Sequence, residues 1–271
     1  MTGQESRYDR IAEGYATHWS PVHRAATLRL LDELPADDLP PRPRIVDVGC
    51  GTGALAVEAA ARWPSAEVEA TDVSAGMLAV AARTVASAGP AGARVHLTRA
   101  PADRLPFPDG SADLALAAFV LQLVPSRPRA LREMRRVLRP GGRLAYVGWL
   151  AGELPFRADQ AWDAALHAAG IERESPGGHD DLASPAAAAA QLRAAGLSRV
   201  RAREDRLVHQ FTPQAYTAFV TRFDDGDLVL GLEPGVRQAL TADLLDRLSR
   251  LPPEALRLEL PIVYVSGVRA S

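Results

Sequence analysis

Between residues 44 and 150, strand-like segments alternate with stretches in which apolar residues recur at helical spacing. Strands are predicted at 45–48, 67–72, 94–98 and 114–119. The last of these is almost continuously apolar, as expected for a strand covered on both faces of a sheet. Helices are predicted at 54–63, 75–88 and 127–139. Strands that alternate with helices predict an α/β fold built on a parallel sheet.

The flanking regions are richer in helix. Residues 7–34 predict one or two helices, and the proline-rich stretch 35–43 predicts a linker. After residue 150 we expect helices at 156–169, 186–195, 212–223 and 234–251, a polar loop at 174–181, and strands at 200–209 and 258–268. The expected organisation is an N-terminal lid and linker (1–43), a core (44–150), and the end of the core sheet with an inserted helical cap (151–271).

The first predicted strand ends at three glycines on alternate positions, Gly49, Gly51 and Gly53. A strand, a glycine turn and a helix form the plan of a nucleotide-binding crossover. Glycine permits the tight turn and lets a ligand approach the backbone more closely than a Cβ allows. With Ala54 the turn also satisfies the dinucleotide pattern G-x-G-x-x-G/A, so both a dinucleotide and another nucleoside cofactor remain open.

Asp72 ends the second predicted strand, about 20 residues after the glycine turn, where an acid accepts both ribose hydroxyls of a bound nucleoside. The alternative is an N-cap on the next helix, a role that Ser74 also suits. Both roles are compatible in one turn.

Four strings in the chain resemble class I S-adenosylmethionine (SAM) dependent methyltransferases, and most closely their ubiquinone/menaquinone-methyltransferase-like group. Residues 45–53 resemble motif I, in which an acid, here Asp47, precedes G-x-G-x-G. Residues 72–78 resemble D-x-S-x-x-M-L, and residues 103–113 resemble D-x-L-P-F-x-D-x-S-F-D. Residues 136–144 resemble the R-V-L-K-P-G-G-x-L turn.

The resemblance implies a Rossmann-like seven-stranded sheet of order 3-2-1-4-5-7-6, with the last strand antiparallel, helices on both faces and a helical substrate cap. It also implies transfer of a methyl group from SAM to an O, N or C atom of a small molecule, for example a secondary metabolite, which leaves S-adenosyl-L-homocysteine.

The resemblance further implies a set of cofactor contacts. Tyr8 and Tyr15 belong to a segment that folds over the cofactor, Met77 lies against the adenine face, and Asp103 takes the adenine amino group. The residues expected at the cofactor are Tyr8, Tyr15, Asp47, Gly49, Cys50, Gly51, Gly53, Asp72, Val73, Met77, Ala102, Asp103, Arg104, Ala118 and Phe119.

No general base stands out in the sequence. Many relatives carry a histidine or another polar residue where this chain has Gln122, and a glutamine does not titrate near neutral pH. The weak catalytic candidates are Gln122, His167, His179 and His209. His18 and His23 are interpreted as surface histidines.

The amino-acid composition disfavours or excludes several classes of protein function. The formal net charge is −2, which disfavours a nucleic-acid substrate. All 31 basic residues are arginine, which excludes lysine Schiff-base chemistry. Cys50 is the single cysteine, so neither an internal disulfide nor a cysteine zinc site is possible, and no metal is expected.

The N-terminal residues show no signal-peptide pattern, and no apolar run is long enough to span a membrane, so a cytoplasmic protein is expected. The alternatives to a small-molecule methyltransferase are a non-catalytic SAM-binding partner subunit, an NAD-dependent oxidoreductase and an RNA methyltransferase. The acceptor, the acceptor atom and the oligomeric state stay open.

Overall fold

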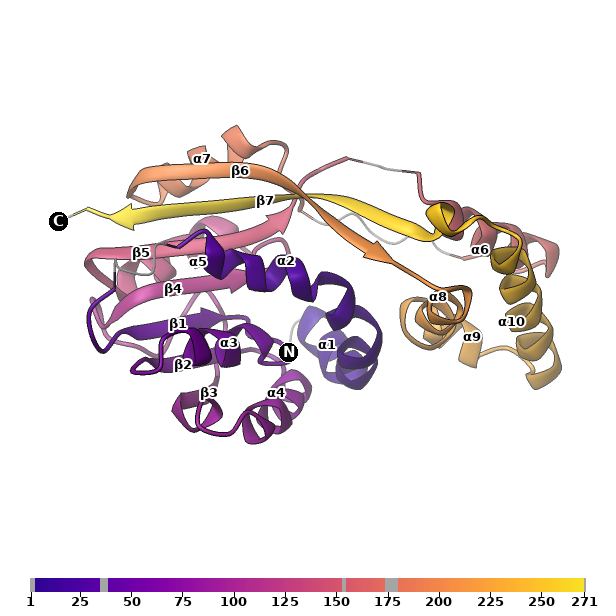
Figure 1. The fold of residues 1–271 in the computed structure, drawn as a ribbon, viewed down its shortest axis with the longest axis horizontal. Coiled ribbons are helices and arrows are strands. Elements are labelled where there is room, and N and C mark those ends of the chain that lie inside the picture. The colour runs from indigo at the N-terminus through magenta and orange to yellow at the C-terminus, as the bar shows by residue number, and fades with distance from the viewer. Residues whose placement is uncertain (1–2, 35–38, 153–154, 174–179, 271) are drawn as a thin grey trace.

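A computed structural model describes residues 3–34, 39–152, 155–173 and 180–270. Within these ranges the chain forms one seven-stranded sheet of order β3-β2-β1-β4-β5-β7-β6, which confirms the expected order (Figure 1). The strands are β1 (Arg44–Val48), β2 (Glu67–Asp72), β3 (Val95–Arg99), β4 (Ala112–Ala118), β5 (Leu138–Trp149), β6 (Leu197–Gln210) and β7 (Arg257–Arg269). The first five strands are parallel, and β7 runs antiparallel between β5 and β6.

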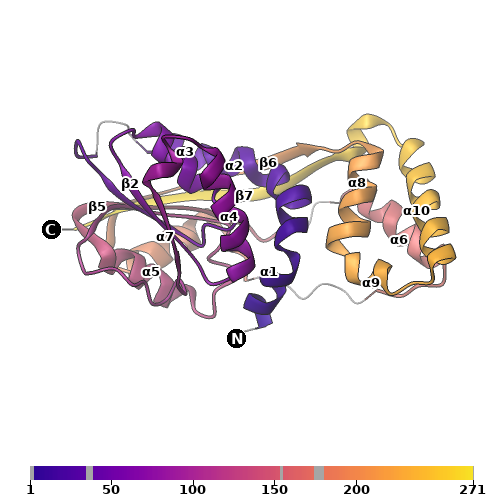
Figure 2. The ribbon, with the colours of Figure 1, turned by 90° about the horizontal axis from the view of Figure 1, so that it is seen from below.

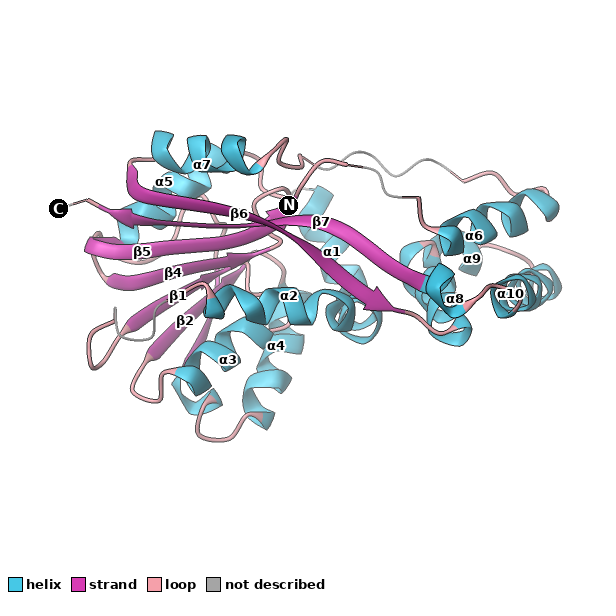
Figure 3. Ribbon diagram, turned by 45° about the horizontal axis from the view of Figure 1, so that its top comes forward, coloured by secondary structure: helices cyan, strands magenta, loops and turns pink. Residues whose placement is uncertain are grey.

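Helices cover both faces of the sheet (Figure 3). The first face carries α2 (Ser20–Asp32), α3 (Ala54–Arg62) and α4 (Ala75–Ser87), and the second carries α5 (Arg127–Val137) and α7 (Pro185–Ala194). Neighbouring strand residues point to opposite faces. Ile45 accordingly packs in the same core as Leu55 of α3, whereas Val46 packs with Met134 of α5. The apolar run of β1 is therefore buried on both sides.

Strands β6 and β7 continue beyond the other strands as a two-stranded ribbon and end at a separate group of helices (Figure 1). This group contains α6 (Arg157–Ala168), α8 (Pro213–Phe219), the π-helical turn η4 (Val220–Asp224), α9 (Gly226–Leu230), α10 (Pro234–Ser249) and the 3₁₀ turn η5 (Pro253–Leu256). Its interior is apolar, and Trp162, Tyr216 and Leu244 are fully buried there. Hereafter α6 and α8–α10, with η4, are called the cap.

The N-terminal segment contains α1 (Gly3–Gly14), the π-helical turn η1 (Tyr15–Trp19) and α2. Helix α1 lies beside α4, between the sheet and the cap (Figure 2). The Asp9 carboxylate accepts hydrogen bonds from the Ser74 hydroxyl (2.7 Å) and the Gly76 amide (2.9 Å) at the start of α4. Ion pairs join Glu5 to Arg99 and Glu13 to Arg83. Hereafter α1 and η1 are called the lid.

Most predicted elements agree with the structure to within three residues at each end. The prediction missed the short helix α9, the π-helical turns η1 and η4, and the 3₁₀ turn η3 (Gly92–Arg94). Parts of the expected linker (35–38) and of the expected polar loop (174–179, with His179) lie outside the described residues. Within the described ranges, no helix combines the length and the hydrophobicity of a membrane-spanning segment.

Candidate active site

The glycine turn after β1 has the backbone conformation that its sequence predicts. Gly49, Gly51 and Gly53 have φ angles of 71°, 52° and 82°, a region that other residues rarely adopt. A Cβ on Gly49 would lie 2.4 Å from a methyl carbon of Val120, whereas a Cβ on Gly51 would meet no atom within 4 Å. Gly49 is therefore required by packing, and the turn at Gly51 faces open space.

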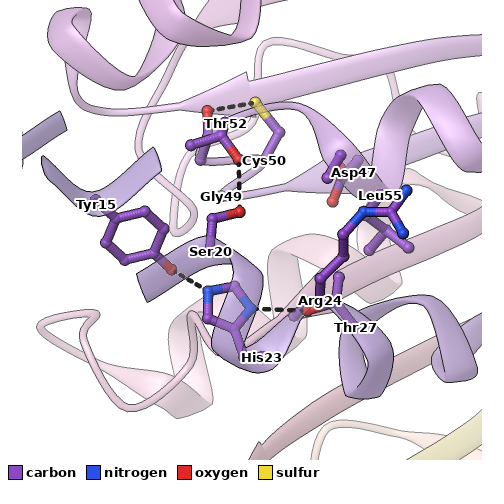
Figure 4. A pocket seen from close by; sticks show the side chains of 13 residues that line it. Tyr15, Ser20, His23, Arg24, Thr27, Asp47, Gly49, Cys50, Thr52 and Leu55 are labelled. Carbon is purple, nitrogen blue, oxygen red and sulfur yellow. Dashed lines mark hydrogen bonds between the residues drawn. The ribbon is translucent and has the colours of Figure 1, made fainter. Parts of the chain in front are cut away.

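A pocket lies between this glycine turn, the start of α3 and the N-terminal helices (Figure 4). The N-terminal segment contributes Tyr15, Ser20, His23, Arg24 and Thr27 to its lining, and the core contributes Asp47, Gly49, Cys50, Gly51, Thr52, Ala54, Leu55 and Ala118. Six of these lining residues are among the cofactor contacts expected from the sequence, namely Tyr15, Asp47, Gly49, Cys50, Gly51 and Ala118.

Asp47 presents an unpaired oxygen in this pocket. The residue is 1% exposed, and its Oδ2 has no hydrogen-bond partner among the described residues. Burial, and secondarily the charge of Asp72, raise the pKa of Asp47 to about 7. The backbone amide of Ala56 interacts with this carboxylate and lowers its pKa in part, but a buried carboxylate with one oxygen unpaired is costly unless a cation pairs with it. The pocket is therefore suited to a ligand that carries an ammonium group.

Arg24 lines the same pocket from α2 and forms no ion pair with a described residue (Figure 4). The sequence analysis did not select it. A cation at one side of the pocket and the Asp47 carboxylate at another complement the carboxylate and the ammonium of an amino acid group. The start of α3 adds backbone amides, which favour an anion at the same place.

Asp72 is held at the end of β2 by two backbone amides. Its Oδ2 accepts from the Gly51 amide and its Oδ1 from the Ser74 amide, both at 2.9 Å. Burial raises the pKa of Asp72, and this effect exceeds the opposite effect of the two hydrogen bonds, which lower the pKa. Ser74, rather than Asp72, caps α4, because its hydroxyl accepts from the Met77 amide (3.0 Å). The Asp72 carboxylate retains lone pairs for two neighbouring hydroxyl groups.

The lid brings two predicted cofactor residues to Asp72. The Tyr8 and Tyr15 rings meet edge to face, with centroids 6.0 Å apart. Met77 is 2% exposed and packs with Ala12 against these two rings. Burial raises the pKa of both tyrosines, and the nearby Asp72 charge acts in the same direction. The two tyrosines and Met77, chosen from separate strings, thus form one surface.

His23 is not at the surface, and that interpretation is wrong. The residue is 8% exposed, and burial lowers its pKa to about 4. Hydrogen bonds join its Nε2 to the Tyr15 hydroxyl (2.8 Å) and its Nδ1 to the Thr27 hydroxyl (3.0 Å) (Figure 4). His18 is half-buried, and burial together with Arg222 lowers its pKa. The spacing of His23 and Thr27, one helical turn apart, was the available signal.

Four further predicted cofactor residues, Val73, Ala102, Asp103 and Arg104, lie after β2 and β3, outside the pocket lining. Asp103 is half-buried, and one carboxylate oxygen lies 3.6 Å from Nε of Arg129 on α5. Val73 is half-buried, and its carbonyl accepts from Arg99 (2.9 Å). Ala102 is half-buried and Arg104 is exposed. These residues share the carboxyl edge of the sheet with Asp72.

Aromatic side chains from three parts of the chain meet beyond the pocket. Phe119, at the end of β4, has a φ of 56° and stacks on Trp149 with ring centroids 4.2 Å apart. Trp19 of the lid contacts Trp149 (6.2 Å) and Phe219 of the cap (5.6 Å). Tyr15 contacts Phe223 of the cap (6.1 Å). Tyr15, Trp19, Phe119, Trp149, Phe219 and Phe223 are hereafter called the aromatic cluster.

Of the catalytic candidates, Gln122, His167 and His209 do not line the pocket, and His179 lies outside the described residues. Gln122 donates its side-chain amide to the Phe119 carbonyl (2.6 Å). His167 is exposed on α6. His209 lies on β6, and its ring packs against that of Phe211, with ring centroids 4.5 Å apart. Burial raises the pKa of the Cys50 thiol well above its usual range. Over the part of the chain that the structure describes, no group of His, Cys, Asp and Glu residues is suited to a metal ion.

Comparison with known proteins also indicates a methyltransferase. A methyltransferase domain family matches residues 45–142. Nocamycin O-methyltransferase of Saccharothrix syringae is 30% identical over 279 residues, and the match covers 96% of each chain. The ubiquinone/menaquinone biosynthesis C-methyltransferase UbiE of Geotalea daltonii is 42% identical over 108 residues, which are 40% of this chain and 46% of the relative. The chain thus spans about half the length of its quinone-biosynthesis relatives.

Among solved structures, a phosphoethanolamine N-methyltransferase of Haemonchus contortus superimposes with a TM-score of 0.59 at 15% identity, over 100% of this chain and 61% of the other. At this identity the likeness shows the fold alone. The match to the Saccharothrix enzyme extends over almost the whole of both chains. The chain therefore belongs to the class I SAM-dependent methyltransferases, the family that uses SAM as its methyl donor.

Proposed function

We propose that this protein transfers the methyl group of SAM to a nucleophilic atom of a small molecule. SAM carries an amino acid end, a ribose and an adenine around one sulfonium, so a binding site must offer complementary groups for all three parts. The proposal depends chiefly on one observation. The buried Asp47 Oδ2 and the exposed Arg24, neither of which has a partner among the described residues, line the same pocket.

In the proposed complex the Asp47 carboxylate accepts from the methionine ammonium, and Arg24 with the backbone amide of Thr52 binds the methionine carboxylate. Asp72 accepts from the two ribose hydroxyls, as its position at the end of β2 suggests.

The adenine then lies beside Tyr8 and Met77, with Asp103 accepting from its amino group. Val73, Ala102 and Arg104 contribute contacts at the same edge, and Ala118 and Phe119 flank the methionine chain. The half-buried positions of Val73, Ala102 and Asp103 are compatible with these contacts.

The chain's own residues perform binding and alignment in this proposal. SAM supplies a methyl group that is already bonded to a positively charged sulfur. The lid and α2 exclude water from the pocket, and the glycine turn fixes the amino acid end. Holding the acceptor in line with the carbon–sulfur bond replaces a bimolecular encounter by a unimolecular one, which supplies much of the rate enhancement.

The proposed organisation assigns the lid and linker to residues 1–43, the SAM-binding core to residues 44–150, and the acceptor cap to the region 151–271. The name of the Saccharothrix relative, an O-methyltransferase of a natural product, supports a small-molecule acceptor. The aromatic cluster, which joins lid, core and cap beside the pocket, supports an acceptor site at that junction.

Isothermal titration with SAM, S-adenosyl-L-homocysteine and NADH tests the proposal. We expect both sulfur compounds to bind and NADH not to bind. Asp72→Ala removes the ribose contacts and should weaken SAM binding by about 10- to 100-fold. Asp246→Ala is the control, because Asp246 is an exposed carboxylate on α10, away from the pocket, and forms an ion pair with Arg250. Equal SAM affinity in the two variants would refute the role of Asp72.

The other function classes give distinct outcomes. The family assignment does not favour an NAD-dependent oxidoreductase, which would bind NADH in the same titration. A non-catalytic partner subunit would bind SAM without transferring its methyl group to any acceptor. An RNA methyltransferase would bind RNA with an affinity that falls steeply with salt, which the net charge of −2 does not favour.

A further inference from the structure

The lid covers the part of the proposed site that holds the adenosine of the cofactor. Met77, beside which the adenine is placed, is 2% exposed, and the Tyr8 and Tyr15 rings pack against it. Tyr15 also lines the pocket at the glycine turn. A cofactor bound between Met77 and these rings is enclosed by the lid. The lid must therefore move away before SAM can enter or S-adenosyl-L-homocysteine can leave.

The movement belongs to α1 and η1, because α2 is fixed to the core. Leu31 of α2 is 1% exposed, and the Tyr264 hydroxyl of β7 donates a hydrogen bond to the Ala26 carbonyl (2.9 Å). Helix α1 is held to the start of α4 by the Asp9 carboxylate, and ion pairs to Arg83 and Arg99 add to this attachment. Polar contacts of this kind contribute a modest net free energy, because water replaces them when they open. A second attachment therefore matters for how long the lid stays closed.

The cap provides this second attachment, and it is apolar. The ring centroids of Trp19 and Phe219 lie 5.6 Å apart, across the boundary between lid and cap. Those of Tyr15 and Phe223 lie 6.1 Å apart, across the same boundary. The lid backbone also approaches the cap closely, since a Cβ built on Gly14 would lie 3.1 Å from Cδ2 of Phe223. Ring contacts of this kind stabilise the closed position by more than the apolar area that they bury.

Both contacting segments contain π-helical turns, η1 in the lid and η4, at the end of α8, in the cap. Such turns are rare and frequently occur at functional sites. The cap side is firmly held, because the Phe219 ring packs on those of Phe211 and Tyr216 in the buried interior of the cap. Helix α8 lies on the side of the cap that faces the lid (Figure 2). An ion pair between Arg10 and Asp227 also joins lid and cap, but both side chains are mostly exposed, so it adds little.

We propose that the cap holds the lid closed over the bound cofactor, so that SAM enters and S-adenosyl-L-homocysteine leaves only when the lid separates from Phe219 and Phe223. The proposal rests on the SAM binding proposed above, and it gives the cap a role in cofactor exchange besides any contact with the acceptor. Because Tyr15 belongs both to the pocket wall and to the contact with Phe223, separation of lid and cap opens the pocket directly. Lid opening of this kind limits turnover in many enzymes.

A disulfide between the lid and the cap tests the proposal. A Cβ built on Gly14 would lie 3.9 Å from the Phe223 Cβ, inside the range of about 3.5–4.5 Å that a disulfide requires. Gly14→Cys combined with Phe223→Cys therefore locks the lid to the cap when it is oxidised, and the native Cys50 is buried and does not compete.

The reduced double variant is loaded with tritiated SAM and then oxidised, and release of the label into excess unlabelled SAM is followed with and without a reductant. We expect the oxidised protein to release the label at least about 100-fold more slowly than the reduced protein, because the remaining route is local unfolding of the lid. Addition of the reductant should restore the faster release.

The oxidised and the reduced protein have the same sequence, so each serves as the control for the other. Equal release rates from the two forms, with the disulfide verified by mass spectrometry, would overturn the proposal. Failure of the disulfide to form under oxidising conditions would also overturn it, because the lid and the cap would then not be in contact. Failure of the wild type to bind SAM would instead refute the proposed methyltransferase function.

Single variants give a second test that needs no disulfide. Phe223→Ala removes the ring that Tyr15 meets and should speed release of the label about 5-fold, as expected for the loss of one aromatic pair. Phe223→Tyr keeps the ring and should stay within about 2-fold of the wild type.

Leu251→Ala is the control in the cap. Leu251 is half-buried against the apolar core and follows α10, which lies on the side of the cap away from the lid (Figure 2). Its replacement should leave the release rate unchanged. An unchanged rate in Phe223→Ala, or an equal increase in Leu251→Ala, would contradict the role of the contact between lid and cap.

Discussion

Replacing Asp47 by asparagine should strengthen the folded protein and weaken its binding of SAM. Asp47 is 1% exposed, and its Oδ2 has no partner among the described residues. Asparagine has the same shape and carries no charge. The substitution therefore removes an unpaired buried carboxylate from the cofactor-free protein, and it removes the partner of the methionine ammonium from the complex.

The size of the stability difference between wild type and Asp47→Asn follows from the pH dependence of the free energy of unfolding. The folded carboxyl has a pKa of about 7, above the value of about 3.9 in an unfolded chain. A raised carboxyl pKa means that the folded state holds its proton longer, so wild-type stability falls as the pH rises between these values. From about pH 5.5 to about pH 7 the loss is about 2 kcal/mol at 1.36 kcal/mol per pH unit, and above pH 7 it levels off.

Urea unfolding of cofactor-free wild type and Asp47→Asn at about pH 5.5 and about pH 8 measures this difference. The advantage of the variant in free energy of unfolding should grow by about 2 kcal/mol between the two conditions. Titration at about pH 8 should show SAM affinity reduced about 30- to 100-fold, the loss of one charge-assisted hydrogen bond of about 2–3 kcal/mol.

Asp113→Asn is the matched control. Asp113 is a strand aspartate of similar burial, but it pairs with Arg139 (2.6 Å) and accepts from the Arg44 amide (2.7 Å), outside the pocket. Its replacement should lower stability at both pH values and leave SAM affinity within 3-fold of wild type, because it removes a satisfied ion pair. A loss of stability in Asp47→Asn, with undiminished SAM affinity, would refute the assignment of Asp47.

Three further results are expected. SAM binding to the wild type at about pH 6 should release a proton, because the protonated Asp47 ionises when it pairs with the ammonium group of SAM. The release is measured as a dependence of the heat of binding on the ionisation enthalpy of the buffer, and the absence of any release would contradict the contact between Asp47 and the ammonium group. Gly49→Ala should cost about 2–4 kcal/mol in thermal unfolding, since its Cβ would lie 2.4 Å from Val120. Gly51→Ala, with free space around its Cβ, should cost only about 1–2 kcal/mol; equal losses would refute the packing argument. Asp9→Ala should speed hydrogen exchange in the lid and weaken SAM binding, since its carboxylate holds α1 on the start of α4; unchanged exchange would show that other contacts hold the lid.

The local sequence pattern was enough to predict the strands and the position of the glycine turn, and the family resemblance supplied the order of the sheet. These features are encoded locally. The run from Ile45 to Val48 is apolar at every position except Asp47, a helix follows the glycines, and Asp72 occupies a strand end. A parallel strand aligns its carboxyl end with those of its neighbours, so the cofactor edge followed from strand identity alone.

The side chains that close the site are brought together by contacts between distant elements, which no local pattern predicts. The burial of His23 depends on Tyr15 and Thr27, and also on the strand end that carries Phe119. Sequence spacing does not show which side of α2 faces the glycine turn, and so Arg24 was missed.

The aromatic cluster was hidden for the same reason. Trp19, Trp149 and Phe219 are separated by most of the chain, and they meet because β6 and β7 extend beyond the sheet and carry the cap to the lid. A local pattern encodes the period of an element and the conformation of a turn. Contacts between distant elements depend on how far each strand extends and on the angle at which each helix packs. Neither the strand length nor the packing angle can be predicted from the spacing of residues along one segment.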